Sequence, residues 1–140
     1  MKFQVLVADQ RMASGRLYPL KVIEAAFRQA APRVLARLMT VHSGVPLTLG
    51  NCVGIVNKLE LKGKRALASI EFLPNMTGTH AKIEASCKEI TFSLKGSGLV
   101  SEIGCVSDYE LTGVVASPRS IGRSDADIAY EEQFDQRIAH

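Results

Sequence analysis

Serine, histidine and cysteine side chains are the groups in this chain that could carry out nucleophilic chemistry. The 140 residues include three histidines and three cysteines. A serine hydroxyl becomes a useful nucleophile only when a neighbouring imidazole removes its proton, and histidine can accept and return a proton near neutral pH. The pair that we consider for this chemistry is His42 and Ser93, with Ser97 as the alternative nucleophile.

The three cysteines, Cys52, Cys87 and Cys105, indicate reduced thiols in a cytosol rather than a disulfide framework. Their number is odd and no two have C-x-x-C spacing, which also disfavours a structural zinc site. Cys87 could act as a thiol nucleophile with His42 or His80, but a free cysteine at a helix-to-strand junction is usually a small buried hydrophobe. We therefore expect mostly buried thiols and no structural zinc site.

Length and composition predict one soluble domain. A chain of 140 residues with 46% hydrophobic content can bury one core but has little room for two. The net charge of +3 comes from scattered basic residues, so no stripe for nucleic-acid binding is evident. Because no apolar run reaches about 20 residues and no secretory leader is recognisable, we expect neither a membrane span nor export.

Hydrophobic periodicity predicts about six strands and two or three peripheral helices. The expected strands are residues 3–8, 52–61, 65–73, 89–94 and 102–116, with a hairpin turn at residues 62–64 and a glycine-rich loop at 96–98. Helices are expected at 19–30, at 79–85 with Thr79 as the cap, and at 128–138, whereas residues 33–41 suit either state. The expected fold is mainly β, of the α+β class, with a closed or nearly closed barrel in residues 1–120 and a polar segment at 121–140 that belongs to the same domain.

Several short motifs follow one another along the chain. Residues 14–19 (SGRLYP) precede an amphipathic helix. A strand ending at His42, a hairpin, a Pro/Gly-bearing loop and a short helix come next, and then a serine before a basic, glycine-rich loop and a V-x-x-P segment at residues 114–118. Over about residues 3–120, this order resembles that of the tailed-phage prohead (head-maturation) serine proteases, a family related in fold to the herpesvirus assemblins, whose opening motif is N-G-R-x-Y-P.

The resemblance implies His42 as general base and Ser93 as nucleophile. It also places an oxyanion site at Leu94, Lys95 and Gly96, where glycine-rich backbone can direct N–H groups at developing charge. Two features depart from the family pattern: Ser43 follows the histidine where many members have proline, and the serine loop reads SLKGSG.

Asp108 and Glu110 are the acids of the late strand that could orient the histidine. They are two residues apart, so a regular strand would present both on one face. The position at which the family usually carries its acid falls near residues 111–113, which are not acidic here.

The function implied by the resemblance is a serine endopeptidase that needs no metal or cofactor. It would cleave scaffold and capsid-associated proteins inside an immature phage head, in the cytoplasm of an infected cell. Scaffold and capsid proteins would be its partners, and a homo-oligomer is compatible with the sequence. The main alternative is a non-catalytic barrel of the same ancestry that acts in capsid assembly. A small-molecule-binding barrel is less favoured, because eight aromatic residues offer few groups to line a cavity.

Overall fold

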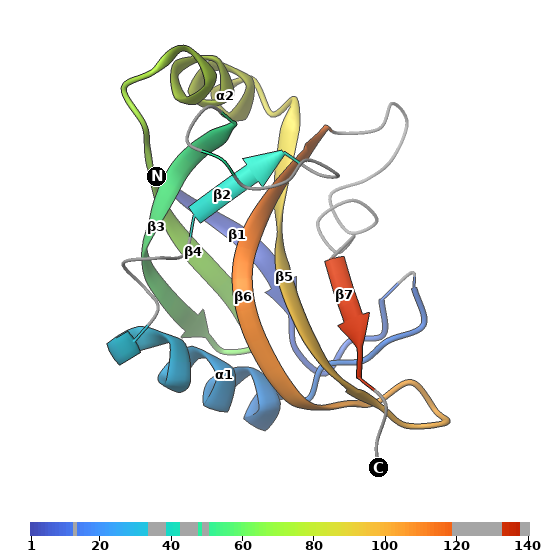
Figure 1. Cartoon of the computed structure of the whole chain (residues 1–140). Coiled ribbons are helices and arrows are strands. Elements are labelled where there is room, and N and C mark those ends of the chain that lie inside the picture. The colour runs from blue at the N-terminus through green and yellow to red at the C-terminus, as the bar shows by residue number, and fades with distance from the viewer. Residues whose placement is uncertain (13, 34–38, 43–47, 49–50, 119–132, 138–140) are drawn as a thin grey trace.

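The computed structural model describes residues 1–12, 14–33, 39–42, 48, 51–118 and 133–137. In this part of the chain, seven strands and two helices follow one another (Figure 1). They are β1 (Lys2–Val7), α1 (Leu20–Arg33), β2 (Met39–His42), β3 (Cys52–Lys62), β4 (Arg65–Phe72), α2 (Met76–Ser86), β5 (Ile90–Val100), β6 (Val106–Pro118) and β7 (Gln133–Gln136). The mainly β composition with flanking helices confirms the predicted class.

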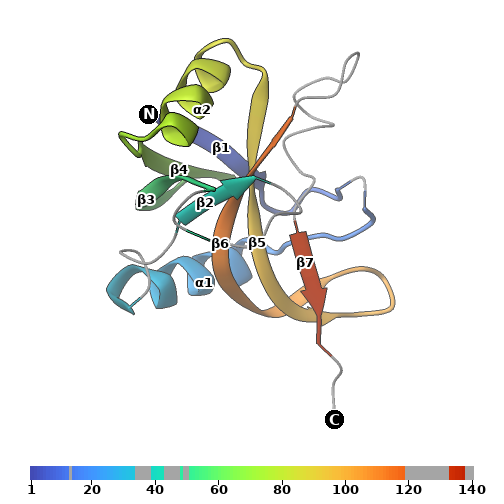
Figure 2. The same cartoon turned by 45° about the horizontal axis from the view of Figure 1, so that its top comes forward.

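All seven strands belong to one sheet, in the order β1-β4-β3-β2-β6-β5-β7. The β2–β6 and β5–β7 pairs are parallel, and the other four pairs are antiparallel. Figures 1 and 2 show a strongly curled sheet with α1 and α2 at opposite ends. The short strand β2 is the link between the β1-β4-β3 half and the β6-β5-β7 half.

The curl brings β1 against β5, although other strands separate them in the sheet. The rings of Phe3 and Phe92 have centroids 4.3 Å apart, and Phe72 packs against both. Among the described strands, however, no pairing joins the two edge strands β1 and β7. The pairings therefore show a curled sheet and not a closed barrel.

The predicted hairpin is confirmed. Strands β3 and β4 pair from Gly54↔Phe72 to Lys62↔Arg65, which leaves a two-residue turn at residues 63–64. Gly63 has a φ of 61°, a value that glycine adopts without steric cost and that two-residue hairpin turns require at this position.

The helices differ from prediction at their ends. Helix α1 begins as expected after Pro19 but continues through Pro32 to Arg33. Helix α2 begins three residues before Thr79, because the side chain of Asn75 accepts a hydrogen bond from the N–H of Gly78 at 2.6 Å and caps the first turn. Of the ambiguous residues 33–41, the described positions 39–41 belong to β2.

One predicted loop and one predicted helix are wrong. Residues 96–98 are not a loop but part of β5, paired with β6 on one side and β7 on the other. The described part of the expected C-terminal helix is β7, whose residue Phe134 packs in a parallel stack with Tyr109 at a centroid distance of 6.2 Å. Residues 128–138 have only a thin apolar face, which would give a helix little stabilisation. Strand pairing and the contact between Phe134 and Tyr109 stabilise β7 more.

The SGRLYP segment joins three parts of the fold. Tyr18 is buried edge-on against Tyr109, with centroids 5.3 Å apart, and the guanidinium of Arg16 lies 4.8 Å from the centre of the Phe134 ring. The N–H of Leu17 donates to the carbonyl oxygen of Gly104 in the β5–β6 turn. The motif that supported the family resemblance therefore has a packing role in this protein.

No helix in the described part of the chain combines the length and apolarity needed to cross a bilayer.

Candidate functional site

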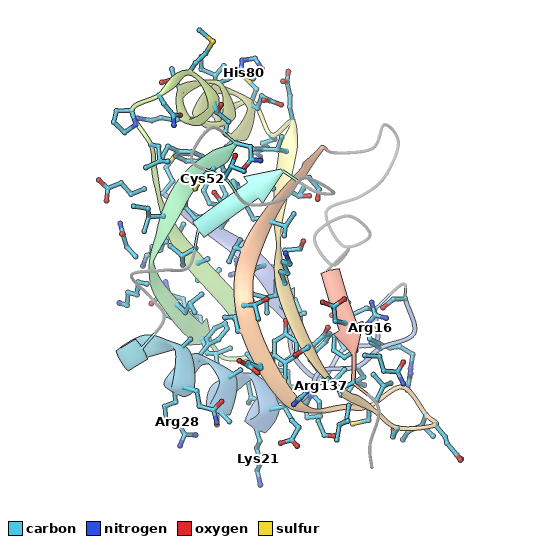
Figure 3. All side chains as sticks on the ribbon, viewed as in Figure 1. Arg16, Lys21, Arg28, Cys52, His80 and Arg137 are labelled. Atoms are coloured by element: carbon cyan, nitrogen blue, oxygen red, sulfur yellow. The ribbon has the colours of Figure 1, made fainter. Side chains whose placement is uncertain are left out.

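Ser93 lies in the first half of β5, within a row of residues that crosses four strands. It pairs with Val115 on β6, Val115 pairs with Val41 on β2, and Val41 pairs with Cys52 on β3. Figure 3 shows Cys52 at the start of β3, beside β2. This row is the part of the sheet where the short linking strand brings the two halves together.

The Ser93 side chain is only 3% exposed, and its hydroxyl has no hydrogen-bond partner among the described residues. Its strand neighbours Phe92 and Leu94 belong to the main apolar core, as do Val114 and Ala116, the residues on either side of its partner Val115. Val115 is buried outside that core. Since side chains alternate across a strand, Ser93 lies on the face of the sheet opposite the core.

His42 is the last residue of β2 and lies one row away from Ser93. Its Cα pairs with Ala116, which in turn pairs with Phe92. With one strand between β2 and β5 and strands spaced about 4.8 Å apart, the two backbones are about 10 Å apart. Only the backbone position of His42 belongs to the described structure, and it places residue 42 next to the Ser93 row.

Ser97 lies four residues further along β5, where it pairs with Glu110 and Asp135. At about 3.3 Å per residue, this position is about 13 Å from Ser93 along the strand. The described pairings of β2 with β6 involve Val114 to Ala116 alone, so Ser97 is the more distant of the two serines from β2.

Asp108 and Glu110 lie far along β6 from the Ser93 row. They precede Val115 by seven and five residues, or roughly 23 and 17 Å along an extended strand. Both residues line a groove beside α1 instead. The structure therefore does not bring either predicted orienting acid to Ser93, because one strand can span much of the molecule.

Leu94, Lys95 and Gly96 form part of the β5–β6 ladder, where they pair with Val114, Gly113 and Leu111. A Cβ added to Gly96 would lie 2.6 Å from the Tyr109 hydroxyl oxygen, so this glycine allows an aromatic ring to pack on the strand. The expected oxyanion residues follow Ser93 in a strand rather than in a turn.

Thr91 and Ser117 are polar residues near Ser93 that the sequence reading did not select. They pair with each other one step along from the Ser93–Val115 pair on the same face, and both are partly buried. In the sequence, Thr91 lies two residues before Ser93 and Ser117 lies two residues after Val115. This spacing could identify them only if the register of β5 against β6 were already known.

The other candidates are dispersed. His80 is exposed on α2 and its Nε2 lies 3.2 Å from a carboxylate oxygen of Glu84, whereas His140 lies outside the described residues. Burial raises the pKa of the Cys52 thiol, but Cys87 is exposed and Cys105 partly exposed, so the prediction of mostly buried thiols is wrong for Cys87.

Within the described residues, no group of three or more His, Cys, Asp or Glu side chains could hold a metal ion. The acids at 125, 127, 131 and 132, which the sequence suggests as a solvated helix start, lie outside that part.

Comparison with known proteins identifies a similar fold but no similar sequence. No protein-family model matches the chain, and no curated protein sequence matches it significantly. Among solved structures, the chain is similar to the bacteriophage T4 capsid assembly protease gp21, with a TM-score of 0.65 and 17% sequence identity. The match covers 86% of this chain and 82% of gp21. The protein therefore has the fold of a phage capsid assembly protease.

Proposed function

We propose that this protein is a serine endopeptidase of capsid assembly, with Ser93 as nucleophile and His42 as general base. The observation that carries the proposal is the position of a buried, unpaired serine hydroxyl one row from the end of β2, in a fold shared with gp21. A serine buried without a partner is costly unless another group compensates, and an imidazole at the end of β2 would do so.

The proposal requires a particular orientation of the His42 side chain at the end of β2. Successive residues of a regular strand face opposite sides of a sheet, and His42 is one row away from Ser93. Its imidazole must therefore leave the regular alternation to reach the face that carries Ser93. β2 already shifts its register against β3 between Thr40 and Val41, which makes a local departure there plausible.

The pair would work without an acidic third member. Val115 occupies the β6 position beside Ser93, so the orienting role falls to a neutral polar group, and Ser117 is the β6 side chain best placed for it. Oxyanion stabilisation would come from backbone N–H groups next to Ser93, with Lys95 contributing positive charge on β5.

The substrates would be scaffold and capsid-associated proteins within the immature head of a phage, in the cytoplasm of its host. In this proposal the chain acts as one nearly closed barrel domain, alone or as a homo-oligomer, and needs no cofactor.

The test is labelling of the full chain with a fluorophosphonate, which phosphonylates activated serines. We expect one label, on Ser93, located by peptide mass spectrometry. The labelling rate should rise with pH through about 6.5, the ordinary pKa of histidine, because the base must be neutral. Ser93→Ala should abolish labelling and His42→Ala should slow it by about 10²–10⁴-fold, while Ser97→Ala should not change it. Circular dichroism of each variant checks that the fold is retained.

A non-catalytic assembly module of the same fold is the second candidate. Two observations favour this module: the Ser93 side chain is only 3% exposed, and Asp108 and Glu110 lie far from Ser93. Absence of labelling in the folded wild-type chain would support this module and contradict the protease, whereas a label on Ser97 would keep the protease and replace its nucleophile.

A further inference from the structure

One face of the β1-β4-β3 half of the sheet carries basic side chains that are scattered in the sequence. Ala66 and Ala68 of β4 belong to the apolar core, so the side chains that alternate with them on β4 point away from the core. Together with their polar partners on β1 and β3, these outward residues are Lys2, Gln4, Lys58, Glu60, Lys62, Arg65, Leu67 and Ser69. We call this set the basic face.

Cations outnumber acids on the basic face. Its four cations are all exposed, and Glu60 is the acid among them. Glu71, two residues beyond Ser69 on β4, is the next acid, and its carboxylate accepts a hydrogen bond from the Asn57 amide at 3.3 Å. Even with Glu71 included, four cations stand against two carboxylates. Strand pairing therefore gathers a positive surface that the sequence does not reveal.

Glu60 lies among three of the lysines and is too few to neutralise them. Its carboxylate oxygens lie 2.7 Å from the Lys2 Nζ and 3.7 Å from the Lys58 Nζ. The hydrogen bond from Lys2 and the charges of the surrounding lysines lower the pKa of Glu60, although partial burial of the carboxyl opposes them. Lys62 and Arg65 form no ion pair with a described residue. Positive charge on the face therefore remains without a counterion.

The charges that border the face are balanced. Lys64, in the hairpin turn, lies 4.0 Å from a carboxylate oxygen of Asp9. On the other border, α1 contributes one acid and one base, Glu24 and Arg28, to a small groove beside β3. The surplus of positive charge is thus confined to the basic face itself.

We propose that the basic face binds an acidic segment of a partner polypeptide, whose carboxylates pair with Lys58, Lys62 and Arg65. Complementary charge both attracts such a segment and selects it against basic ones. Glu60 shows that lysines of this face hold a carboxylate when one is present. Lys58 and Lys62 are four residues apart on β3, about 13 Å, so about four extended residues of the partner would span them.

The composition of the face favours a polypeptide over a nucleic acid. Proteins that bind single-stranded nucleic acid combine positive charge with exposed aromatic rings on which bases stack. The aromatic residues of β1 and β4, Phe3 and Phe72, instead pack against Phe92. Arginine is the residue best shaped to bind phosphate, and the one arginine of the face, Arg65, already donates through Nε to the Gln4 side chain at 2.7 Å. The remaining cations are lysines, which bind single carboxylates as readily.

The experiment measures binding of a fluorescent octaglutamate peptide to the full-length Ser93→Ala chain, which keeps binding separate from any cleavage. We expect binding at low ionic strength that weakens as added salt screens the charges. Lys62→Gln should weaken it by about two- to fivefold, the effect of one exposed charge pair, and Lys58→Glu combined with Lys62→Glu by about tenfold or more. Glu60→Gln should strengthen it by about two- to fivefold, because a competing carboxylate is removed.

Lys21→Glu is the matched control, because Lys21 is an exposed lysine that projects from α1 beside β6, off the basic face (Figure 3). It changes the net charge as Lys58→Glu does but should leave peptide binding within about twofold of the parent chain. Circular dichroism checks the fold of each variant, and Lys62→Gln provides the test if the charge reversals do not fold.

Three results would overturn the proposal. The first is no binding of the peptide at low salt, or an equal effect of Lys21→Glu and Lys58→Glu, which would reflect net charge alone. The second is tighter binding of an oligothymidylate of the same length that Lys58→Glu weakens, since the partner would then be a nucleic acid. The third is concentration-dependent self-association that Lys58→Glu abolishes, since the occupant would then be a second copy of the chain.

Discussion

At the scale of single residues, side chains of the same type differ in how deeply the fold buries them. Ser93 and Ser97 belong to one strand, yet Ser93 is buried beside Val115 of β6, whereas Ser97 is partly exposed between Glu110 and Asp135. Cys52 and Cys87 differ in the same way. Burial thus distinguishes the candidate nucleophile Ser93 and the unreactive thiol of Cys52 from more exposed residues of the same type.

The contrast between the two thiols leads to a prediction about their reactivity. Thiolate is the reactive form, and burial raises the pKa of Cys52, so its thiol should react with Ellman's reagent only slowly in the native protein. Cys87 is exposed and should account for the fast phase, which Cys87→Ser should remove. Cys52→Ser, as the matched variant, should leave the fast phase intact.

The sign of the pH effect follows from the same raised pKa. The folded chain holds the Cys52 proton more tightly than the unfolded chain does, so the associated stability is fully present below the ordinary thiol pKa of about 8.5 and is lost as pH rises through the raised value. Fast modification of Cys52 at neutral pH would contradict its burial.

At the scale of elements, the ends of helices and strands depend on individual hydrogen bonds. α2 has no acidic residue in its first turn, and the side chain of Asn75 supplies the cap that its first N–H groups need. β2 ends at His42 after pairing with three residues of β6, so its length determines where the candidate base lies.

The cap of α2 is tested by Asn75→Ala. Loss of the bond from the N–H of Gly78 should lower the free energy of unfolding by about 1 kcal/mol, measured by urea denaturation. Thr79→Ala is the matched control, because Thr79 is exposed inside the helix and alanine favours helix. If Thr79→Ala were the more damaging change, the helix would begin at the later position that the sequence suggests.

At the scale of the whole molecule, three segments distant in sequence are joined by direct contacts. The SGRLYP segment contacts the β5–β6 turn through Leu17 and contacts β7 through Arg16 and Tyr18. Phe134 is the residue of β7 that these contacts converge on. β7 therefore depends on tertiary contacts, since four residues alone cannot form a stable strand.

Phe134→Ala should release β7 from β5. We expect a loss of about 1–3 kcal/mol in the free energy of unfolding, less than for a fully buried ring because Phe134 is partly exposed. Hydrogen exchange should become faster at the β5 amides that face β7, within residues 95–98, and not in the half that contains Ser93. Gln136→Ala, at an exposed position of the same strand, should have neither effect, and unchanged exchange in Phe134→Ala would show that ring contacts do not retain β7.

The sequence by itself determined the features that depend on local patterns. Runs rich in apolar residues located β1, β3 and β4, a glycine located the hairpin turn, and helical spacing located α1. The family resemblance, read from short motifs, predicted a fold that the similarity to gp21 supports.

Only the tertiary structure decided which of these elements meet. It incorporated the Gly96 region into a strand and made a strand of residues 133–136. It also placed Asp108 and Glu110 beside α1, seven and five residues from the partner of Ser93. The physical reason is that strand register and the packing of Phe134 on Tyr109 join residues far apart in sequence. A period of two along one strand specifies a face, but it does not specify which strand lies opposite or at which residue.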